Sequence, residues 1–300
     1  MTTALQGSFV ALPTPFRNGQ IDWASFENLA RWQIESGTRG LVPCGTTGET
    51  PALTHEEQIS LVKKTIEIAA GRALVMAGCG ANGTAKTIKL AQEIAALGPD
   101  ALLVVTPYYN RPSQHGLLEH YQAVAKSVKT PICIYNVPSR TGCNIEPDTV
   151  LALAKSCPSI VAIKEASGSL DQASFIVREA PSGFSVLSGE DSLNLPLLAV
   201  GAVGVVSVLA NVAPRGVADM ISAWNEGNAD KARRLHLKLW PLSRALFVET
   251  NPIPVKWALH RLGKFASPEL RLPLVTLTPD NAVKLERALA GAGLLEPAAA

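Results

Sequence analysis

The sequence has no Cys-x-x-Cys pair and no run of basic residues longer than two. Its cysteines are odd in number and widely spaced, which argues against a disulfide framework and is typical of reduced thiols in a cytoplasmic protein. They are Cys44, Cys79, Cys133, Cys143 and Cys157. The net charge is only +2, so electrostatics gives no reason to expect a nucleic acid or an anionic membrane as a partner.

Signals for metal binding, secretion and membrane insertion are also missing. None of the 5 histidines stands in a His-x-x-x-His or similar spacing, which argues against a metal hydrolase. No basic segment precedes the first apolar residues, so we expect no secretory signal. The uncharged stretch 195–213 is about as long as a membrane span. Pro196, Gly201, Gly204 and Asn211 divide it into a short helix, a turn and a strand, which favours a buried α/β segment.

The sequence does contain a regular alternation of strand and helix patterns. Short apolar, β-rich segments recur roughly every 25 to 30 residues, the span of one βα unit. They lie at 8–15, 40–45, 73–80, 101–107, 131–136, 160–164, 184–189 and 204–208. Amphipathic segments lie between them, and two carry helix start signals: Thr54 with Glu57 matches a capping box, and Ser113 precedes another helical pattern.

This alternation predicts an α/β fold, a (β/α)8 TIM barrel, with a doubly wound open sheet as the alternative. At 300 residues and 47% hydrophobic composition, the chain is able to bury the core of one large α/β domain. After residue 212 the pattern is helical only. We therefore predict a catalytic barrel over residues 1–224 and a C-terminal helical domain over residues 225–300.

A lysine ends one of the predicted strands, in the segment SIVAIKEASG at residues 159–168. Barrel enzymes place their chemistry just past the carboxyl ends of the strands. An amine at the apolar mouth of a barrel loses hydration, which lowers its pKa and makes it a nucleophile towards carbonyl groups. Lys164 is therefore a candidate Schiff-base residue. The alternatives are a side chain that snorkels to solvent or one that pairs with Glu165.

Hydroxyl groups follow two other predicted strands. Tyr135 ends the strand that neighbours the strand of Lys164 in a barrel, which makes it a candidate proton shuttle for imine chemistry. Its alternative role is an aromatic ring that caps the barrel rim. The quartet Gly45-Thr46-Thr47-Gly48 suits a small anion, because the glycines allow close approach and the threonines offer hydroxyls. Alternatively, it is a tight turn whose threonines cap the next helix.

Charged residues near the strand ends indicate the class of substrate. Arg140, in NVPSRTG, has the fork geometry that binds a carboxylate, although many loop arginines are only solvated. The loop after the seventh predicted strand carries Glu190 and Asp191, where a phosphate-binding barrel needs bare backbone amides. This favours carboxylate substrates over sugar phosphates.

One motif supports a different class of enzyme. Residues 78–83 match Gly-x-Gly-x-x-Gly and follow a predicted strand, as in a nicotinamide-dependent dehydrogenase. That fingerprint opens the first βαβ unit and is followed by an acidic residue at the end of the next strand. Here the motif lies in the third unit, Asp100 precedes the next strand, and Thr106 follows it. The oxidoreductase is kept as a distant alternative.

Several segments together resemble the dihydrodipicolinate synthase branch of the pyruvate-dependent class I aldolases, relatives of N-acetylneuraminate lyase. They are VPCGTTGE, VTPYYNRPSQHG, IYNVPSRTG, IKEASG, LSGED and FVETNPIPVKWAL, and the likeness runs over residues 6–294. The resemblance implies a (β/α)8 barrel with a C-terminal helical domain, usually in a homotetramer built as a dimer of dimers. It implies no cofactor other than the covalent imine that a lysine forms with pyruvate.

The resemblance also implies the reaction and the residues that perform it. The pyruvate enamine attacks aspartate 4-semialdehyde to give 4-hydroxytetrahydrodipicolinate, on the way to diaminopimelate and lysine. Matched by motif, Lys164 forms the Schiff base and Tyr135 donates and accepts protons. Thr46 joins the proton relay with Tyr109, which in the family crosses from the neighbouring subunit.

Other matched residues bind the substrates. Thr47 binds the carboxylate of pyruvate, and Gly189 and Val206 line its site. Arg140 receives the carboxylate of the semialdehyde. Relatives that share the lysine and the tyrosine take other aldehydes, so an N-acetylneuraminate or 2-keto-3-deoxy sugar acid lyase is the nearest alternative, and a non-catalytic ligand-binding barrel is a further one.

The feedback site for lysine, which lies at the dimer interface in inhibitable members, is only partly matched. His55, Asn82 and Tyr108 agree with that pattern. Lys86 stands where those members have a carboxylate, and Gln58 replaces a histidine. Because an added amine repels the amine of lysine, we expect weak or absent inhibition by lysine.

Overall fold

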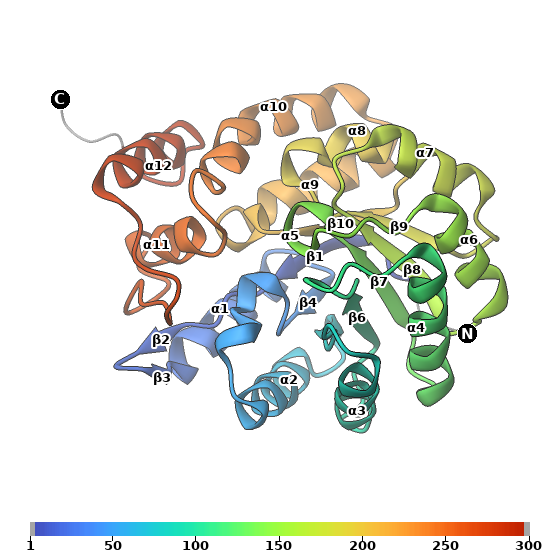
Figure 1. The fold of residues 1–300 in the computed structure, drawn as a ribbon. Coiled ribbons are helices and arrows are strands. Elements are labelled where there is room, and N and C mark those ends of the chain that lie inside the picture. The colour runs from blue at the N-terminus through green and yellow to red at the C-terminus, as the bar shows by residue number, and fades with distance from the viewer. Residues whose placement is uncertain (1–3, 297–300) are drawn as a thin grey trace. The chain divides into compact units, whose positions relative to one another are not determined.

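The computed structural model describes residues 4–296, and its main feature is a closed barrel of parallel strands linked by helices (Figure 1). The order around the barrel is β1-β10-β9-β8-β7-β6-β5-β4. These strands are β1 (Gly7–Ala11), β4 (Gly40–Val42), β5 (Leu74–Gly78), β6 (Ala101–Val105), β7 (Ile132–Asn136), β8 (Ile160–Glu165), β9 (Ser185–Ser188) and β10 (Gly204–Ser207). The predicted (β/α)8 barrel is confirmed, and the open sheet is excluded, because an open sheet would leave two edge strands.

Helices follow the strands and continue beyond the last one (Figure 1). They are α1 (Trp23–Glu35), α2 (His55–Ala69), α3 (Thr84–Ala95), α4 (Gln114–Ser127), α5 (Pro138–Thr141), α6 (Pro147–Ser156), α7 (Leu170–Glu179), α8 (Asn194–Ala199), α9 (Pro214–Asn225), α10 (Ala229–Ala245), α11 (Ile253–Arg261) and α12 (Pro279–Gly291). Short 3₁₀ helices are η1 (Thr46–Gly48), η2 (Thr50–Ala52), η3 (Asp191–Leu193) and η4 (Leu209–Asn211). The small hairpin β2 (Phe16–Arg17) and β3 (Gln20–Ile21) lies outside the barrel sheet.

Both predicted helix start signals are confirmed. At the start of α2, the Thr54 hydroxyl accepts a hydrogen bond from the backbone N–H of Glu57, and the Glu57 carboxylate accepts one from the N–H of Thr54. At the start of α4, the Ser113 hydroxyl accepts one from the N–H of Gly116. These bonds satisfy amide groups that have no partner within the helix.

The first strand and the long uncharged stretch show how proline and glycine limit the elements. β1 ends at Ala11, earlier than the predicted 8–15, because Pro13 and Pro15 have no N–H for a strand ladder. The stretch 195–213 forms most of α8, the strand β10 and the short helix η4, as predicted. No helix within residues 4–296 is long and apolar enough to cross a membrane.

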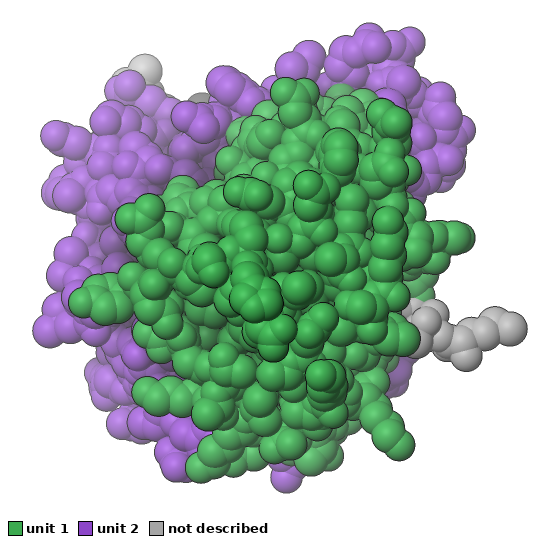
Figure 2. Space-filling view, turned by 45° about the vertical axis from the view of Figure 1, so that its right-hand side comes forward, with its two compact units in different colours: residues 1–7, 74–206 green, residues 8–73, 207–300 purple. Residues whose placement is uncertain are grey.

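The chain divides into two compact units (Figure 2). One comprises residues 1–7 and 74–206, and it contains β5 to β9 with the helices α3 to α8. The other comprises residues 8–73 and 207–300, and it contains β4, α1, α2 and the helices α9 to α12. Each has a fully buried apolar core, with Met76, Leu102 and Ile134 in the first and Phe26 and Leu61 in the second. The predicted division at residue 225 falls at the end of α9 and stays a prediction.

Candidate active site

Lys164 and Tyr135 lie side by side on adjacent strands. The register of β7 and β8 pairs Tyr135 with Lys164, so both side chains point to the same face of the sheet. The Lys164 Nζ lies 4.0 Å from the centroid of the Tyr135 ring. Each residue is only 6% exposed. A lysine that snorkelled to solvent would be far more exposed, so this alternative for Lys164 is wrong, and a proton shuttle is within reach of the amine.

Glu165 faces the opposite side and does not pair with Lys164. Its carboxylate accepts hydrogen bonds from the Asn136 side-chain amide at 3.1 and 3.3 Å, the backbone N–H of Ser167 at 2.6 Å and the Gln172 amide at 2.9 Å. Gln172 belongs to α7, so Glu165 faces the helix layer, and Lys164, its neighbour along the strand, faces the interior. The network joins the ends of β7 and β8 and so fixes the two strands that carry the amine and the phenol.

Gly189, directly after β9, packs against the stem of the lysine. A Cβ atom at this position would lie 3.0 Å from Cε and 3.1 Å from Cγ of Lys164, and 2.7 Å from Cβ of Ala166. A Cβ atom this close to the non-bonded Cβ of Ala166 would force a shift of the surrounding atoms, so glycine suits this position. The backbone N–H of Gly189 donates to the carbonyl of Glu165 at 2.8 Å, which holds the close approach. Val206, the other predicted lining residue, is buried within β10.

Arg140 and Tyr109 belong to two connected loops. Arg140 lies in the last turn of α5, which begins two residues after β7, and its side chain is exposed. The N–H of Tyr109 donates to the carbonyl of Thr141 at 3.3 Å, which joins the two loops. Tyr109 is 89% exposed and has a φ of 73°, a conformation that a bulky residue adopts only under constraint. Its ring therefore lies at the surface and does not join the buried pair of Lys164 and Tyr135.

Thr46 and Thr47 lie in the short helix η1, which begins four residues after the end of β4. Cys44 and Glu49, which flank this loop, both have a φ of 55°. A left-handed conformation costs about 1–2 kcal/mol for such residues, so the surrounding structure must hold the loop. The residue that caps the next helix, α2, is Thr54. The alternative that Thr46 or Thr47 caps this helix is therefore wrong.

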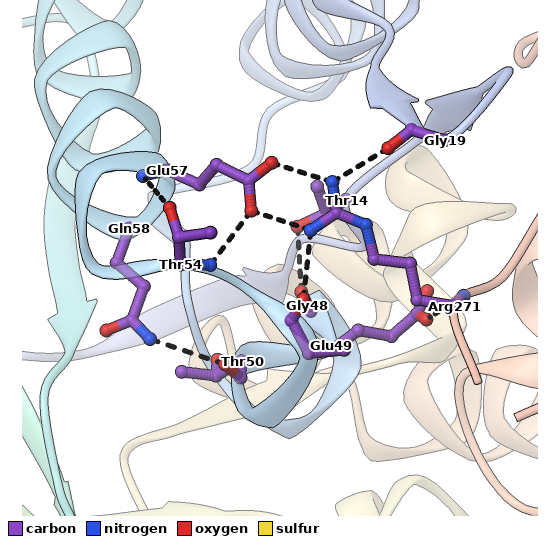
Figure 3. A network of polar contacts seen from close by, with 10 residues as sticks. Thr14, Gly19, Gly48, Glu49, Thr50, Thr54, Glu57, Gln58 and Arg271 are labelled. Carbon is purple, nitrogen blue, oxygen red and sulfur yellow. Dashed lines mark hydrogen bonds and ion pairs between the residues drawn. The ribbon is translucent and has the colours of Figure 1, made fainter. Parts of the chain in front are cut away.

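Two hydrogen bonds fix this loop from outside. The Asn251 side-chain amide donates to the Thr47 hydroxyl at 3.0 Å. The Thr14 hydroxyl donates to the carbonyl of Gly48 at 2.8 Å (Figure 3). Because the Thr47 oxygen accepts from Asn251, its own O–H remains as a donor, which is what a carboxylate needs. Thr47 is buried and Thr46 is half-buried.

Cys44 and Cys133 are poor candidates for a nucleophile. All five cysteines are free thiols. Burial raises the pKa of Cys44 and of Cys133 to about 12, so both remain protonated at neutral pH. Within residues 4–296, no group of three or more His, Cys, Asp or Glu side chains is arranged to hold a metal ion.

One backbone amide of the Gly-x-Gly-x-x-Gly segment already has a hydrogen-bond partner. The Thr87 hydroxyl accepts a hydrogen bond from the N–H of Ala81 at 3.1 Å, where a dinucleotide site would offer this amide to phosphate. Asp100 accepts from the N–H of Val75 at 2.8 Å, near the start of β5. It therefore lies at the opposite end of the strand from a ribose site. Both features argue against the oxidoreductase.

The candidate regulatory residues are surface groups on three segments. His55 is exposed at the first position of α2, and the Gln58 amide donates to the carbonyl of Thr50 at 3.3 Å. Lys86 is exposed on α3, and Tyr108 is 38% exposed after β6. The carbonyl of Asn82 accepts from the Asn110 amide at 2.8 Å.

Sequence reasoning missed two buried polar residues near residues 45–48, which we call the threonine loop. Asn251 contacts Thr47, and Lys256 is fully buried on α11 and bonded to Glu49. A signal was present, because the segment NPIPVKWAL places one lysine among apolar residues of a helix. Such a lysine requires a buried partner.

Comparisons with known proteins agree with this geometry. The model of the dihydrodipicolinate synthetase family matches residues 4–292. A 4-hydroxy-tetrahydrodipicolinate synthase of Syntrophus aciditrophicus is 50% identical over 97% of this chain and 99% of its own. The synthase structure from Methylacidiphilum fumariolicum SolV is 49% identical, covers 96% of both chains and has a TM-score of 0.95. A chloride-inhibited dihydrodipicolinate synthase from Acinetobacter baumannii, complexed with pyruvate, is 41% identical over 97% of this chain and 100% of its own, with a TM-score of 0.94. As the sequence predicted, the chain belongs to the dihydrodipicolinate synthetase family.

Proposed function

We propose that the protein catalyses the reaction of a 4-hydroxy-tetrahydrodipicolinate synthase, the condensation of pyruvate with L-aspartate 4-semialdehyde through a lysine Schiff base. The observation that carries the proposal is the buried Lys164 amine 4.0 Å from the Tyr135 ring centroid, in a chain of this family. The Acinetobacter baumannii relative binds pyruvate, which supports pyruvate as the first substrate here. No cofactor takes part beyond the covalent imine.

The reaction follows from the chemistry of these two groups. The Lys164 nitrogen attacks the ketone carbon of pyruvate, and the carbinolamine loses water after Tyr135 protonates the departing oxygen. Tyr135 then accepts a proton from the pyruvate methyl group, which gives the enamine. The enamine carbon forms a C–C bond to the aldehyde carbon of the semialdehyde, whose oxygen takes up a proton. Finally, the substrate's amino group displaces the lysine amine and closes the ring.

The remaining assignments concern substrate binding. Thr47 donates its hydroxyl to the carboxylate of pyruvate, and Gly189 and Val206 line the same site. Arg140 binds the carboxylate of the semialdehyde, for which its fork of N–H donors is suited. The exposure of Arg140 supports this role, because the second substrate arrives only after the imine has formed.

The proton relay needs a second copy of the chain. Thr46 links Tyr135 to Tyr109, which is contributed by a neighbouring subunit. The 89% exposure of Tyr109 and its constrained backbone support a ring held outwards for a partner. We propose a homotetramer built as a dimer of dimers, as the family resemblance implies, which sedimentation equilibrium tests directly. A cytoplasmic location and a C-terminal helical domain over residues 225–300 belong to the same proposal.

The decisive experiment traps the imine. The protein is incubated with pyruvate, reduced with borohydride and mapped by peptide mass spectrometry. We expect the adduct on Lys164, its loss in Lys164→Arg, and its retention in the control Lys155→Arg, which changes an exposed lysine on α6. An adduct elsewhere, or none on the folded protein, would refute the mechanism. Turnover with sugar aldehydes instead of the semialdehyde would assign the protein to the sugar acid lyases.

A further inference from the structure

The residue that follows the threonine loop, Glu49, forms a buried ion pair with Lys256 that the proposed chemistry does not use. The Glu49 Oε1 accepts a hydrogen bond from the Lys256 Nζ at 2.5 Å. The two side chains are 1% and 0% exposed. The other carboxylate oxygen, Oε2, accepts from the backbone N–H of Arg271 at 3.0 Å (Figure 3). Both oxygens of Glu49 are therefore engaged, and the residue that ends the loop is fixed.

Lys256 lies in a setting that suits an apolar side chain. Val255 and Leu259 on α11 are fully buried, and the Lys256 Nζ lies 4.2 Å from the centroid of the Phe16 ring. Burial lowers the pKa of Lys256 to about 8, although the Glu49 carboxylate acts in the opposite direction. A buried ion pair adds little stability compared with well-packed apolar residues of similar size. A role in fixing a conformation accounts for the pair better than a role in stability.

The same segment holds the loop at a second point. Asn251, two residues before α11, donates to the Thr47 hydroxyl, and five residues later Lys256 binds Glu49. The loop that these two bonds hold is flanked by two residues in the left-handed conformation, Cys44 and Glu49. A strained loop persists only where its surroundings impose it. Without the Glu49 anchor, the loop would relax and carry the Thr47 hydroxyl away from its working position.

An outer ion pair in the same network offers a matched comparison. Arg271 binds Glu57 through two parallel hydrogen bonds of 2.6 Å each (Figure 3). This pair is partly exposed, with both side chains 21% accessible, and it joins the Arg271 side chain to α2. Because Glu57 has no bond to residues 45–49, its removal loosens the network without releasing the threonine loop.

We propose that Glu49 and Lys256 are positioning residues that hold the Thr47 hydroxyl in place for the carboxylate of pyruvate. The inference rests on the proposed function, since it assigns the pair to the pyruvate step. Neither residue touches the substrate in this account. Their effect passes through the loop 45–48.

The test compares the double variant Glu49→Gln/Lys256→Met with Glu57→Gln. The double variant replaces both charges together, so no unpaired charge is left buried. We expect its KM for pyruvate, measured by imine trapping, to rise about tenfold, because a small displacement of a binding group is costly. In Glu57→Gln the stability falls, but the KM for pyruvate stays within about twofold of wild type. An unchanged KM in the double variant would overturn the proposal.

A coupling measurement shows whether the effect passes through Thr47. Thr47→Val alone should raise the KM for pyruvate, and it should add little in the Glu49→Gln/Lys256→Met background, because residues that act through one group are not additive. Full additivity would show that the pair acts elsewhere and would refute the proposal.

Failure of the proposed function and failure of the positioning role give different results. If the wild-type protein forms no adduct on Lys164, the proposed function itself fails. If the wild-type protein forms the adduct and Glu49→Gln/Lys256→Met has the same KM for pyruvate, only the positioning role fails. If the double variant does not fold, Glu49→Asp decides the question. It keeps the charge but shortens the side chain, so it should draw the loop back and raise the KM for pyruvate, and an unchanged KM there refutes the inference.

Discussion

The close contact between Gly189 and Lys164 makes Gly189→Ala a sharp test of the site. The added Cβ would lie 3.0 Å from Cε and 3.1 Å from Cγ of Lys164, and 2.7 Å from Cβ of Ala166. Ala166 has no flexible side chain with which to yield, so part of the strain passes to the backbone of the β8 and β9 ends. The rest displaces the stem of Lys164, the proposed Schiff-base residue.

The expected magnitude differs between stability and chemistry. Overpacking by one methyl group in a close-packed interior costs about 1–3 kcal/mol, which a chain of this size survives. The rate of imine formation should suffer more, because a misplacement of about 1 Å in a reacting group costs on the order of 100-fold. We therefore expect a folded protein with a modest loss of stability and a fall of roughly 10- to 100-fold in the rate of pyruvate trapping.

The assay is borohydride trapping under single-turnover conditions, together with urea unfolding of the same samples. Gly83→Ala is the control, because a Cβ at Gly83 meets no atom of the described residues within 4 Å and its φ of −122° suits alanine. It should trap pyruvate at the wild-type rate. Gly189→Ala with an unchanged trapping rate would show that the lysine stem is not confined by this contact, and the reasoning from the structure would fail.

Three further predictions concern the aldehyde, lysine and pH. Arg140→Ala should weaken the use of the semialdehyde by about 10- to 100-fold, since a hydrogen bond to a charged group contributes about 1.5–3 kcal/mol. Imine formation with pyruvate should remain nearly intact. Equal losses in both steps would contradict the assignment. Lysine below millimolar concentration should not give half-maximal inhibition, and Lys86→Glu should increase the response to lysine, whereas sub-millimolar inhibition of wild type would overturn this expectation. Burial lowers the pKa of His120 from 6.5 to about 4, and its Nε2 has no hydrogen-bond partner within residues 4–296. As the pH falls from 6.5 to 4, the unfolded chain binds a proton that the folded chain does not, so the free energy of unfolding should fall by at most about 3 kcal/mol. Urea unfolding between pH 6.5 and 4 should show a smaller fall in the free energy of unfolding for His120→Phe than for the wild-type protein. An equal fall in the two proteins would contradict this prediction.

The sequence was sufficient for the features that depend on local pattern. The order of strands follows from apolar segments at regular spacing, and the capping box of α2 follows from two residues three apart. The contact between Lys164 and Tyr135 was also accessible. Consecutive strands are neighbours in a barrel, so two residues at the ends of consecutive strands are expected to lie close together.

The support of the site was not accessible, because it depends on contacts between distant parts of the chain. Glu49 and Lys256 are 207 residues apart in sequence, and Arg271 and Glu57 are 214 apart. No periodicity encodes such pairs. A charged residue in an apolar helix indicates that a partner exists, but only the folded chain identifies it.

One irregularity in the sheet explains how the lysine reaches the interior at all. At the start of β7 and β8, Ile132 pairs with Ile160, and the register then shifts by one residue, so that Cys133 pairs with Ala162. In an unshifted register, Tyr135 would stand opposite Ile163. Lys164 would then share the face of Asn136, which is directed towards the helix layer, because a slip of one residue turns every side chain of a strand to the other face. The extra residue, Val161, is therefore what brings the amine beside the phenol, and it places Glu165 beside Asn136 in the supporting network by the same step.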